Sequence, residues 1–228
     1  TKALKTERKL RMAITGPSGT GKTFTALAIA QALGNRIALI DTEHGGSTLY
    51  ADEFDFDYVS LDSFSPENYI KYLEAAAKER YPVVIVDTIS HAWMGKDGTL
   101  EIVDRQASKN KGENRFTAWQ VGSKKQTEFV EALLSVPFHL IVTMRSKMDY
   151  LMEQDGAKTK IAKVGLAPVQ RDGIEYEFDV IGDMDTQHTM TITKSRVRPL
   201  TDRVIPTPGR EFGQEIVAAL QEGMVTTP

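Results

Sequence analysis

The sequence predicts an α/β fold, with a mostly parallel sheet flanked by helices and an antiparallel extension toward the C-terminus. Two observations support this prediction. Short apolar runs alternate with helical patterns along the first part of the chain, and the runs lack polar alternation, as strands buried on both faces do. The later part shows alternating apolar residues on either side of a turn, which is typical of paired antiparallel strands.

Four apolar runs are the predicted strands of the parallel sheet, and the segments between them are long enough for crossover helices. One helix is expected to begin at Pro66, with Ile70, Leu73 and Ala77 on its buried face. Another is expected just before the fourth run. The runs are Met12–Thr15, Ile37–Ile40, Val83–Val86 and Leu140–Met144.

The composition is that of an ordinary globular chain. The chain has 228 residues, of which 26% are charged, and a net charge of −3, so a nucleic-acid site would need a local basic patch. It has no cysteine, which excludes disulfides and thiolate metal sites. No apolar run approaches the roughly 18 residues of a membrane span. We expect a cytoplasmic protein with one domain over residues 1–228 and no membrane association.

Two long connections are predicted at strand ends, where α/β proteins carry function. The first, over about residues 91–125, is expected to be an irregular insertion that is partly mobile around 108–115. The second covers 145–173, where Asp155-Gly156 could turn a hairpin. Beyond Gly173 we expect two antiparallel strands joined near residues 185–188. A last helix follows Pro208. The apolar positions are Tyr176, Phe178 and Val180, then Met190 and Ile192, then Phe212, Ile216, Ala219 and Leu220.

One motif indicates the chemistry. Gly16-Pro17-Ser18-Gly19-Thr20-Gly21-Lys22-Thr23 matches G-x-x-x-x-G-K-[ST] at every fixed position, between a strand pattern and a helical one. Its glycines let successive N–H groups face an anion, and the helix that follows adds its positive end. Lys22 would reach the β- and γ-phosphates of ATP, and Thr23 would hold Mg²⁺. A glycine-rich turn is the alternative, but a turn alone does not require Lys-Thr here.

Two carboxylates at strand ends extend this prediction. Asp87 ends an apolar run, where phosphate-loop enzymes place the Walker B aspartate that holds Mg²⁺. Thr88 follows it, so a general base must come from elsewhere. Glu43 stands just beyond a strand that we expect beside the phosphate-loop strand, and it could orient water toward the γ-phosphate. The alternatives are a helix cap for Asp87 and an exposed loop acid for Glu43.

The stretch Asp41-Thr42-Glu43-His44 resembles the strand-end D-x-E-H of the RecA family, whose Glu is catalytic. The position of Tyr50 is similar to that of the family's tyrosine that stacks on adenine, with core packing as the alternative. The compact plan also resembles phage-encoded ATPases of the AAA-24 type and related RecA-like single-strand annealing proteins. The resemblance implies a RecA-like core that hydrolyses ATP with Mg²⁺ in a bacterial host cell.

The stretch from His139 to Arg145 resembles the family's sensor strand, with Thr143 or Arg145 in place of the usual Gln. Residues 146–171 then occupy the position of the family's DNA-binding loop, and their cations could follow a phosphate backbone. A solvated loop is the alternative. The candidate residues for single-stranded DNA are Arg145, Lys147, Lys158, Lys160, Lys163 and Arg171.

Lys194 and Arg196 are similar to the K-x-[KR] pair of RecA-like ATPases and hexameric helicases, which reaches the ATP of the next protomer. The resemblance implies a homo-oligomer, a ring or a filament, in which these two residues are catalytic in trans. The alternative is a strand end whose charges reach water. The four histidines lack metal-ligand spacing and are expected to be structural.

The function that follows is ATP hydrolysis coupled to single-stranded DNA, in recombination or strand annealing. Two alternatives stay open. One is a nucleotide-dependent switch or motor that binds a protein partner and not DNA. The other is a small-molecule kinase, which is disfavoured because kinases usually carry a lid with arginines.

Overall fold

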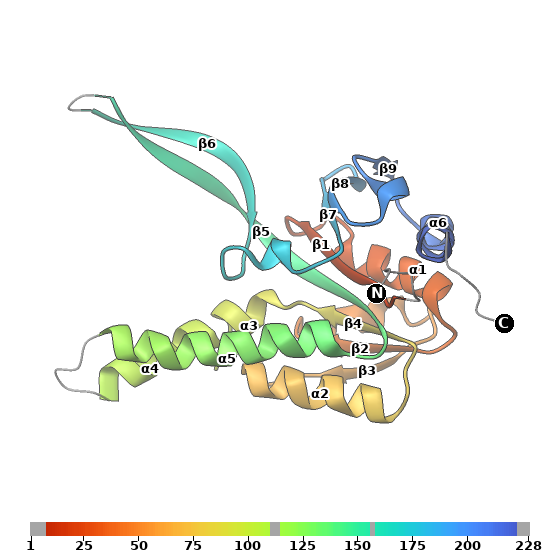
Figure 1. Cartoon of the computed structure of the whole chain (residues 1–228), viewed down its shortest axis with the longest axis horizontal. Coiled ribbons are helices and arrows are strands. Elements are labelled where there is room, and N and C mark those ends of the chain that lie inside the picture. The colour runs from red at the N-terminus through yellow and green to blue at the C-terminus, as the bar shows by residue number, and fades with distance from the viewer. Residues whose placement is uncertain (1–7, 110–114, 156–157, 223–228) are drawn as a thin grey trace, which may run out of the picture.

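The computed structural model describes residues 8–109, 115–155 and 158–222. In them, strands form one twisted sheet with helices on both faces, and a two-stranded arm projects from the body (Figure 1). The strands are β1 Arg11–Gly16, β2 Ile37–Asp41, β3 Asp57–Ser60, β4 Val83–Asp87, β5 His139–Asp155, β6 Lys158–Pro168, β7 Val180–Met184, β8 Thr189–Ser195 and β9 Val204–Pro206. The helices are α1 Lys22–Leu33, α2 Pro66–Lys78, α3 Ser90–Met94, α4 Thr99–Lys109, α5 Arg115–Ser135 and α6 Arg210–Gln221, with 3₁₀ turns η1 Gly46–Tyr50, η2 Ile174–Tyr176 and η3 Arg198–Leu200.

The strand order is β3-β2-β4-β5-β1-β7-β8-β9, and β6 pairs with β5. The strands from β3 to β7 in this order are parallel, whereas β8 and β9 are antiparallel. The predicted fold class is therefore confirmed. One expectation was wrong, because β4 and β5 separate the Glu43 strand, β2, from β1. Local sequence does not encode strand order, which depends on how each crossover packs.

Helices cover the two faces of the sheet and create two apolar cores. Successive strand residues point to opposite faces, so Met12 packs in the core under α1 and α6 while Ala13 packs in the core under α2, α3 and α5. All four predicted apolar runs are strands, and the final helix buries Phe212 and Ile216 as expected. No helix of the described residues combines the length and the apolar character needed to cross a membrane.

Three local expectations are corrected. β3 was missed because its sequence, Asp-Tyr-Val-Ser, has no apolar run and lies at the sheet edge. The strand expected from Tyr176 begins at Val180, since Gly173 starts a 3₁₀ turn instead. Helix α2 turns Tyr69, Leu73 and Ala76 inward. Ile70 and Ala77 are only partly buried because the helix, capped by Ser65, has a different rotation.

The first long connection is helical and not irregular. Helices α3, α4 and α5 occupy most of it, and residues 110–114 of the polar stretch lie outside the described residues. Gly122 explains the close packing of α4 on α5, because a Cβ there would lie 2.4 Å from Val103 Cγ2. Most residues of this connection are polar, so its sequence shows little apolar pattern, and the contact between the two helices through a small residue was not predicted.

The second long connection is an extended hairpin arm. Strand β5 continues past the sheet and pairs with β6 from Ser146 opposite Pro168 to Asp155 opposite Lys158, and the ribbon leaves the body (Figure 1). The predicted hairpin is confirmed by this register, although Gly156 itself lies outside the described residues. The strand that forms the centre of the sheet is therefore also the root of the arm.

Candidate nucleotide-binding site

The phosphate loop joins β1 to α1 at the carboxyl edge of the sheet. Gly16 ends β1 at a close approach, since a Cβ there would lie 2.6 Å from the carbonyl oxygen of Met184. Gly21 has a φ of 85° and is the N-cap of α1. Because glycine offers no capping side chain, the first N–H groups of α1 remain available for an anion.

Lys22 lies over this loop. Its Nζ donates to the carbonyl oxygens of Gly16 at 2.9 Å and Pro17 at 2.7 Å, contacts that a phosphate would replace. Burial lowers the pKa of Lys22, and the negative charges of Asp87 and Glu43 oppose this shift. Burial therefore weakens the charged form of this ammonium, and an anionic phosphate bound here would restore it.

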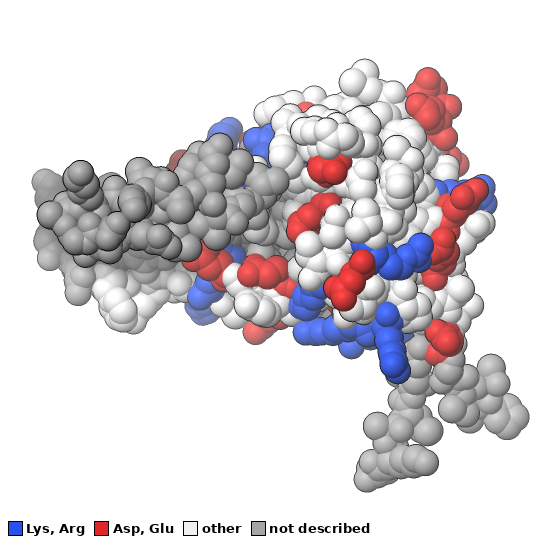
Figure 2. Space-filling model, turned by 90° about the horizontal axis from the view of Figure 1, so that it is seen from above, with Lys and Arg blue, Asp and Glu red and all other residues white. Residues whose placement is uncertain are grey.

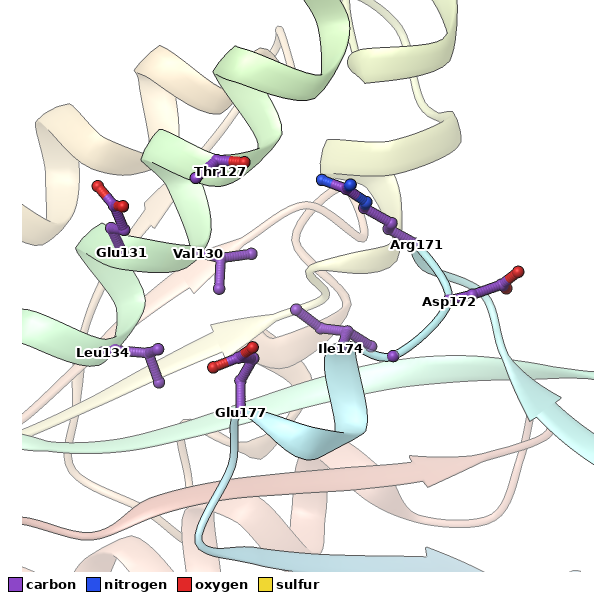
Figure 3. Close-up of a pocket in the computed structure, with 9 residues that line it drawn as sticks. Thr127, Val130, Glu131, Leu134, Arg171, Asp172, Ile174 and Glu177 are labelled. Carbon is purple, nitrogen blue, oxygen red and sulfur yellow. The ribbon is translucent and has the colours of Figure 1, made fainter. Parts of the chain in front are cut away.

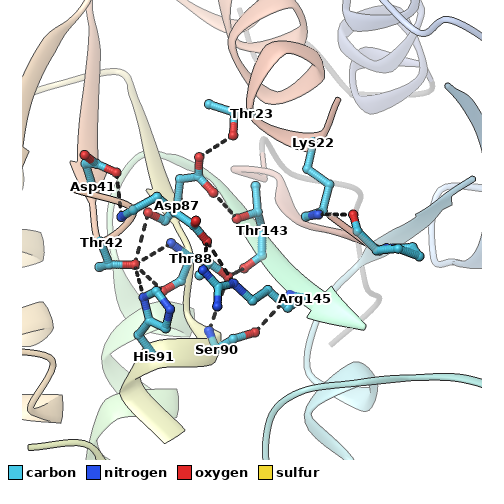
Figure 4. A network of polar contacts seen from close by, with 12 residues as sticks. Lys22, Thr23, Asp41, Thr42, Asp87, Thr88, Ser90, His91, Thr143 and Arg145 are labelled. Carbon is cyan, nitrogen blue, oxygen red and sulfur yellow. Dashed lines mark hydrogen bonds and ion pairs between the residues drawn. The ribbon is translucent and has the colours of Figure 1, made fainter. Parts of the chain in front are cut away.

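A set of oxygen ligands suited to Mg²⁺ surrounds the end of β4. Thr23 Oγ1 donates to Asp87 Oδ2 at 2.5 Å, and Thr143 Oγ1 donates to Asp87 Oδ1 at 2.5 Å (Figure 4). Burial raises the pKa of Asp87, while these two hydroxyls oppose the rise. Mg²⁺ is usually held by one or two carboxylates, a hydroxyl and phosphate oxygens, so Thr23 and Asp87 fit the ion.

The loop after β2 is shaped by Asp41 and Thr42. Asp41 is buried and its carboxylate accepts from the N–H groups of Glu43 at 2.8 Å and Gly45 at 2.5 Å. Thr42 Oγ1 lies within hydrogen-bond distance of the carbonyl oxygens of Asp87 and Thr88 and accepts from the Thr88 N–H. It also lies 2.9 Å from His91 Nδ1. These contacts fix the loop to the Walker B strand. No role was predicted for Thr42, whereas His91 was expected to be structural.

Glu43 forms an ion pair across the site. Arg145, on β5, donates from Nε at 3.0 Å and from Nη2 at 2.8 Å, both to Glu43 Oε1. The Arg145 backbone N–H donates to Ser90 Oγ at 2.9 Å (Figure 4). The two residues stand 102 positions apart in the sequence. Among the candidate sensors, Arg145 therefore contacts the proposed base, whereas Thr143 contacts the proposed metal ligand.

These groups line one cavity of about 530 Å³, which we call the phosphate cavity. It contains Lys22, Thr23, Glu43, Asp87 and Arg145. An adjoining cavity of about 400 Å³, the base cavity, shares Tyr50, Gly19 and Gly21 with it; its other lining residues are Thr20, Phe24, Thr25, Met184, His188, Thr207 and Pro208.

Tyr50 lines the base cavity and also packs against the apolar core under α1, which was the alternative for this residue. Its ring lies edge to face with Phe24, with centroids 5.8 Å apart, so the two rings form an apolar wall beside the phosphate loop. An aromatic wall of this kind suits the flat face of a nucleobase. Phe24 was not among the predicted site residues, although it directly follows the loop motif, and His188 was expected to be structural. His188 could not be found, because it comes from the other end of the chain.

A family model described as an AAA domain matches residues 8–218, which is most of the chain. The chain belongs to the AAA domain family. Membership indicates a nucleotide-binding ATPase in general, and the predicted AAA-24 resemblance is confirmed. A search of curated proteins found no match.

The pair expected to act in trans lies far from this AAA domain's own phosphate loop. Lys194 Nζ donates to the carbonyl oxygens of Glu175 at 2.8 Å and Tyr176 at 2.6 Å, and Arg196 donates to Tyr176 at 3.0 Å. Lys194 is opposite Ile181, near the start of β7, whereas the phosphate loop follows the other end of β1. This register places both residues too far from the phosphate loop of their own subunit to act on its ATP. Their hydrogen bonds also hold the turn η2 in place.

The structure separates the candidate DNA-binding cations of the AAA domain. Lys147 is exposed at the root of the arm, beside Arg145. Arg171 instead borders a third cavity, of about 470 Å³, between α5 and η2 (Figure 3), where Glu131 and Glu177 also lie. The candidates on β6 are placed by their backbone only, and their side chains lie outside the described part; they are Lys158, Lys160 and Lys163.

Charge on one face of the AAA domain is mixed. Figure 2 shows Lys and Arg side chains gathered near one margin of this face, with Asp and Glu side chains among and beside them. Binding of a phosphate backbone requires clustered cations. A track for single-stranded DNA would therefore have to use another surface, and the arm with its lysines is the candidate that the sequence provides.

Proposed function

We propose that this protein is a Mg²⁺-dependent ATPase that hydrolyses ATP to ADP and phosphate. The observation that supports it best is the convergence of Lys22, Thr23, Asp87 and Glu43 on one cavity at the carboxyl edge of the sheet. Glu43 lines the same cavity and can orient water for attack on the γ-phosphate. A small-molecule kinase would use such a carboxylate on its acceptor instead, so phosphate release without an added acceptor distinguishes the two activities.

Each residue has a distinct role in the proposed reaction. The N–H groups of the loop and Lys22 bind and orient the phosphates, and Thr23 with Asp87 would hold Mg²⁺, which neutralises charge that develops on the phosphate oxygens. Glu43 accepts a proton from the attacking water. Arg145 holds this carboxylate in place, and Oε2 can accept the proton. Both Arg145 contacts go to Oε1, so Oε2 lies outside the ion pair.

The finer proposal is that ATP controls binding of single-stranded DNA, in recombination or strand annealing by a phage-encoded protein in the bacterial cytoplasm. Its support is the continuity of β5. This strand carries Thr143, which contacts Asp87, and Arg145, which lines the phosphate cavity, and then runs directly into the arm. Three lysines lie on β6. A displacement of Arg145 would therefore also displace the β5 residues at the root of the arm.

Binding of labelled single-stranded oligonucleotide should depend steeply on salt. The K158A/K160A/K163A variant is expected to bind more weakly and to reduce the slope of log K against log salt by about two to three, because each lost phosphate contact removes roughly 0.7–1 from the slope. Fluorescence titration over a salt series, with and without a non-hydrolysable ATP analogue, measures this. K71A/K78A, which removes cations from α2, is the control.

A parent protein that binds nucleotide tightly but shows no salt-dependent binding of DNA would contradict the DNA proposal. That result would favour the alternative of a nucleotide-dependent switch or motor with a protein partner. Equal slopes for the parent and the arm variant would place the DNA track elsewhere.

We further propose that subunits assemble into a ring or filament in which Lys194 and Arg196 reach the neighbouring ATP. Mixtures of K194A and E43Q subunits, dissociated and reassembled together, should then recover activity that neither variant has alone. At equal amounts about a quarter of the interfaces would combine an intact pair with an intact Glu43. Phosphate release across mixing ratios measures the recovery.

The T193A variant is the matched control for mixing, since Thr193 is exposed on the neighbouring position of β8. T193A keeps both the basic pair and Glu43, so its mixtures with E43Q should show activity in proportion to the fraction of T193A subunits. An absence of recovery at every ratio of K194A to E43Q would remove the trans role and leave Lys194 as the residue that holds η2.

A further inference from the structure

His188 is fixed against the phosphate loop from the other end of the chain. It lies in the turn between β7 and β8 with a φ of 61°, and its N–H donates to the carbonyl oxygen of Asp185 at 3.1 Å. Its own carbonyl accepts from Thr207 at 3.0 Å, and its ring Nδ1 lies 3.1 Å from the carbonyl oxygen of Thr20. The ring therefore joins the C-terminal extension to the loop at the base cavity.

The contact with Thr20 determines which ring nitrogen carries the proton. A carbonyl oxygen only accepts, so Nδ1 must donate, and Nε2 of the neutral imidazole is then an acceptor without hydrogen. Thr20, Thr25, Tyr50 and Thr207 also line the cavity, but the hydroxyl that each carries can donate or accept. In this tautomer Nε2 of His188 can only accept a hydrogen bond. Among the described side chains that line the cavity, it is therefore the ring nitrogen that needs a donor from the ligand.

The aromatic wall of the cavity cannot choose between bases. Phe24 and Tyr50 offer ring surface, and every base has a flat face that can pack on it. Selection between nucleobases must therefore come from a polar group that can only donate or only accept a hydrogen bond. Two acceptors that face each other in a cavity both lose their hydrogen bonds to water, which lowers affinity.

We propose that His188 is the specificity-determining residue for the nucleobase, and that it selects a base with an exocyclic amino group, adenine, over a 6-oxo purine. Nε2 accepts a hydrogen bond from the 6-amino group, whereas the 6-oxo group presents a second acceptor. The inference rests on the proposed ATPase function and deepens it, because it names the group that makes ATP the preferred triphosphate.

ATP and ITP are the matched probes, because ITP carries an oxo group at the carbon where ATP carries the amino group. The parent protein is expected to bind ATP about 10- to 100-fold more tightly than ITP. His188→Phe keeps a flat ring without the acceptor and should bind ATP as weakly as the parent binds ITP. His188→Gln, whose side-chain oxygen can accept, should restore part of the preference. Competition against a fluorescent triphosphate measures each affinity.

Inorganic tripolyphosphate separates base selection from support of the loop. It should compete equally well on the parent and on His188→Phe, because it uses only the phosphate cavity. Equal losses for ATP, ITP and tripolyphosphate would mean that the ring merely supports the loop, and would overturn the proposal. An ATP preference that persists in His188→Phe, or equal affinities in the parent, would overturn it too. Failure of the parent to bind any triphosphate would instead refute the ATPase function.

Discussion

The K22A variant is expected to release phosphate from ATP at least ~100-fold more slowly than the parent, since losing one charge-stabilising donor typically costs about 10²–10³-fold in rate. Lys22 is the cation closest to the loop, with its Nζ at the Gly16 and Pro17 carbonyl oxygens. The measurement is phosphate release without any added acceptor, which also distinguishes an ATPase from a kinase.

K78A is the matched control, because Lys78 is an exposed lysine at the end of α2. It should keep the parental rate, and thermal unfolding followed by circular dichroism should show that both variants fold. A folded K22A protein that hydrolyses ATP at the parental rate would refute the catalytic assignment of the loop.

The E43Q variant is expected to lose hydrolysis by about 10²–10⁴-fold, the usual contribution of a positioned general base, while its affinity for ATP stays within a few-fold of the parent's. Gln has the shape of Glu but does not take up the proton of water, and ATP binding depends mainly on Lys22 and the loop. Steady-state hydrolysis combined with binding of a fluorescent ATP analogue separates the two effects.

E53Q makes the same chemical change at an exposed position beyond η1 and should retain activity. The ion pair with Arg145 is solvent-exposed on both sides, at 35% for Glu43 and 47% for Arg145, so its loss should change stability by at most about 1 kcal/mol. Unchanged hydrolysis in E43Q would assign the base to another residue.

Sequence and structure agree where the information is local. The phosphate loop was predictable residue by residue because its spacing alone sets the backbone: Gly16 makes the close approach, Gly21 the positive φ, and Lys22 begins the helix. Asp87 was predictable because an apolar strand that ends in a carboxylate delivers it to the edge of the sheet. The helix predicted just before the fourth apolar run is the end of α5. The helices over 91–125 were not predicted, since their packing depends on small residues such as Gly122 that leave little apolar pattern.

By itself, the sequence determined an α/β core with its phosphate-loop motif and placed Thr23 and Asp87 at strand and helix ends, because each of these follows from short-range spacing and strand hydrophobicity. Only the tertiary structure decided which distant groups meet. It paired Glu43 with Arg145 and brought His188 to the carbonyl of Thr20, 168 positions away. Such contacts depend on strand order and on how each crossover packs against the sheet, and no local pattern of residues carries that information.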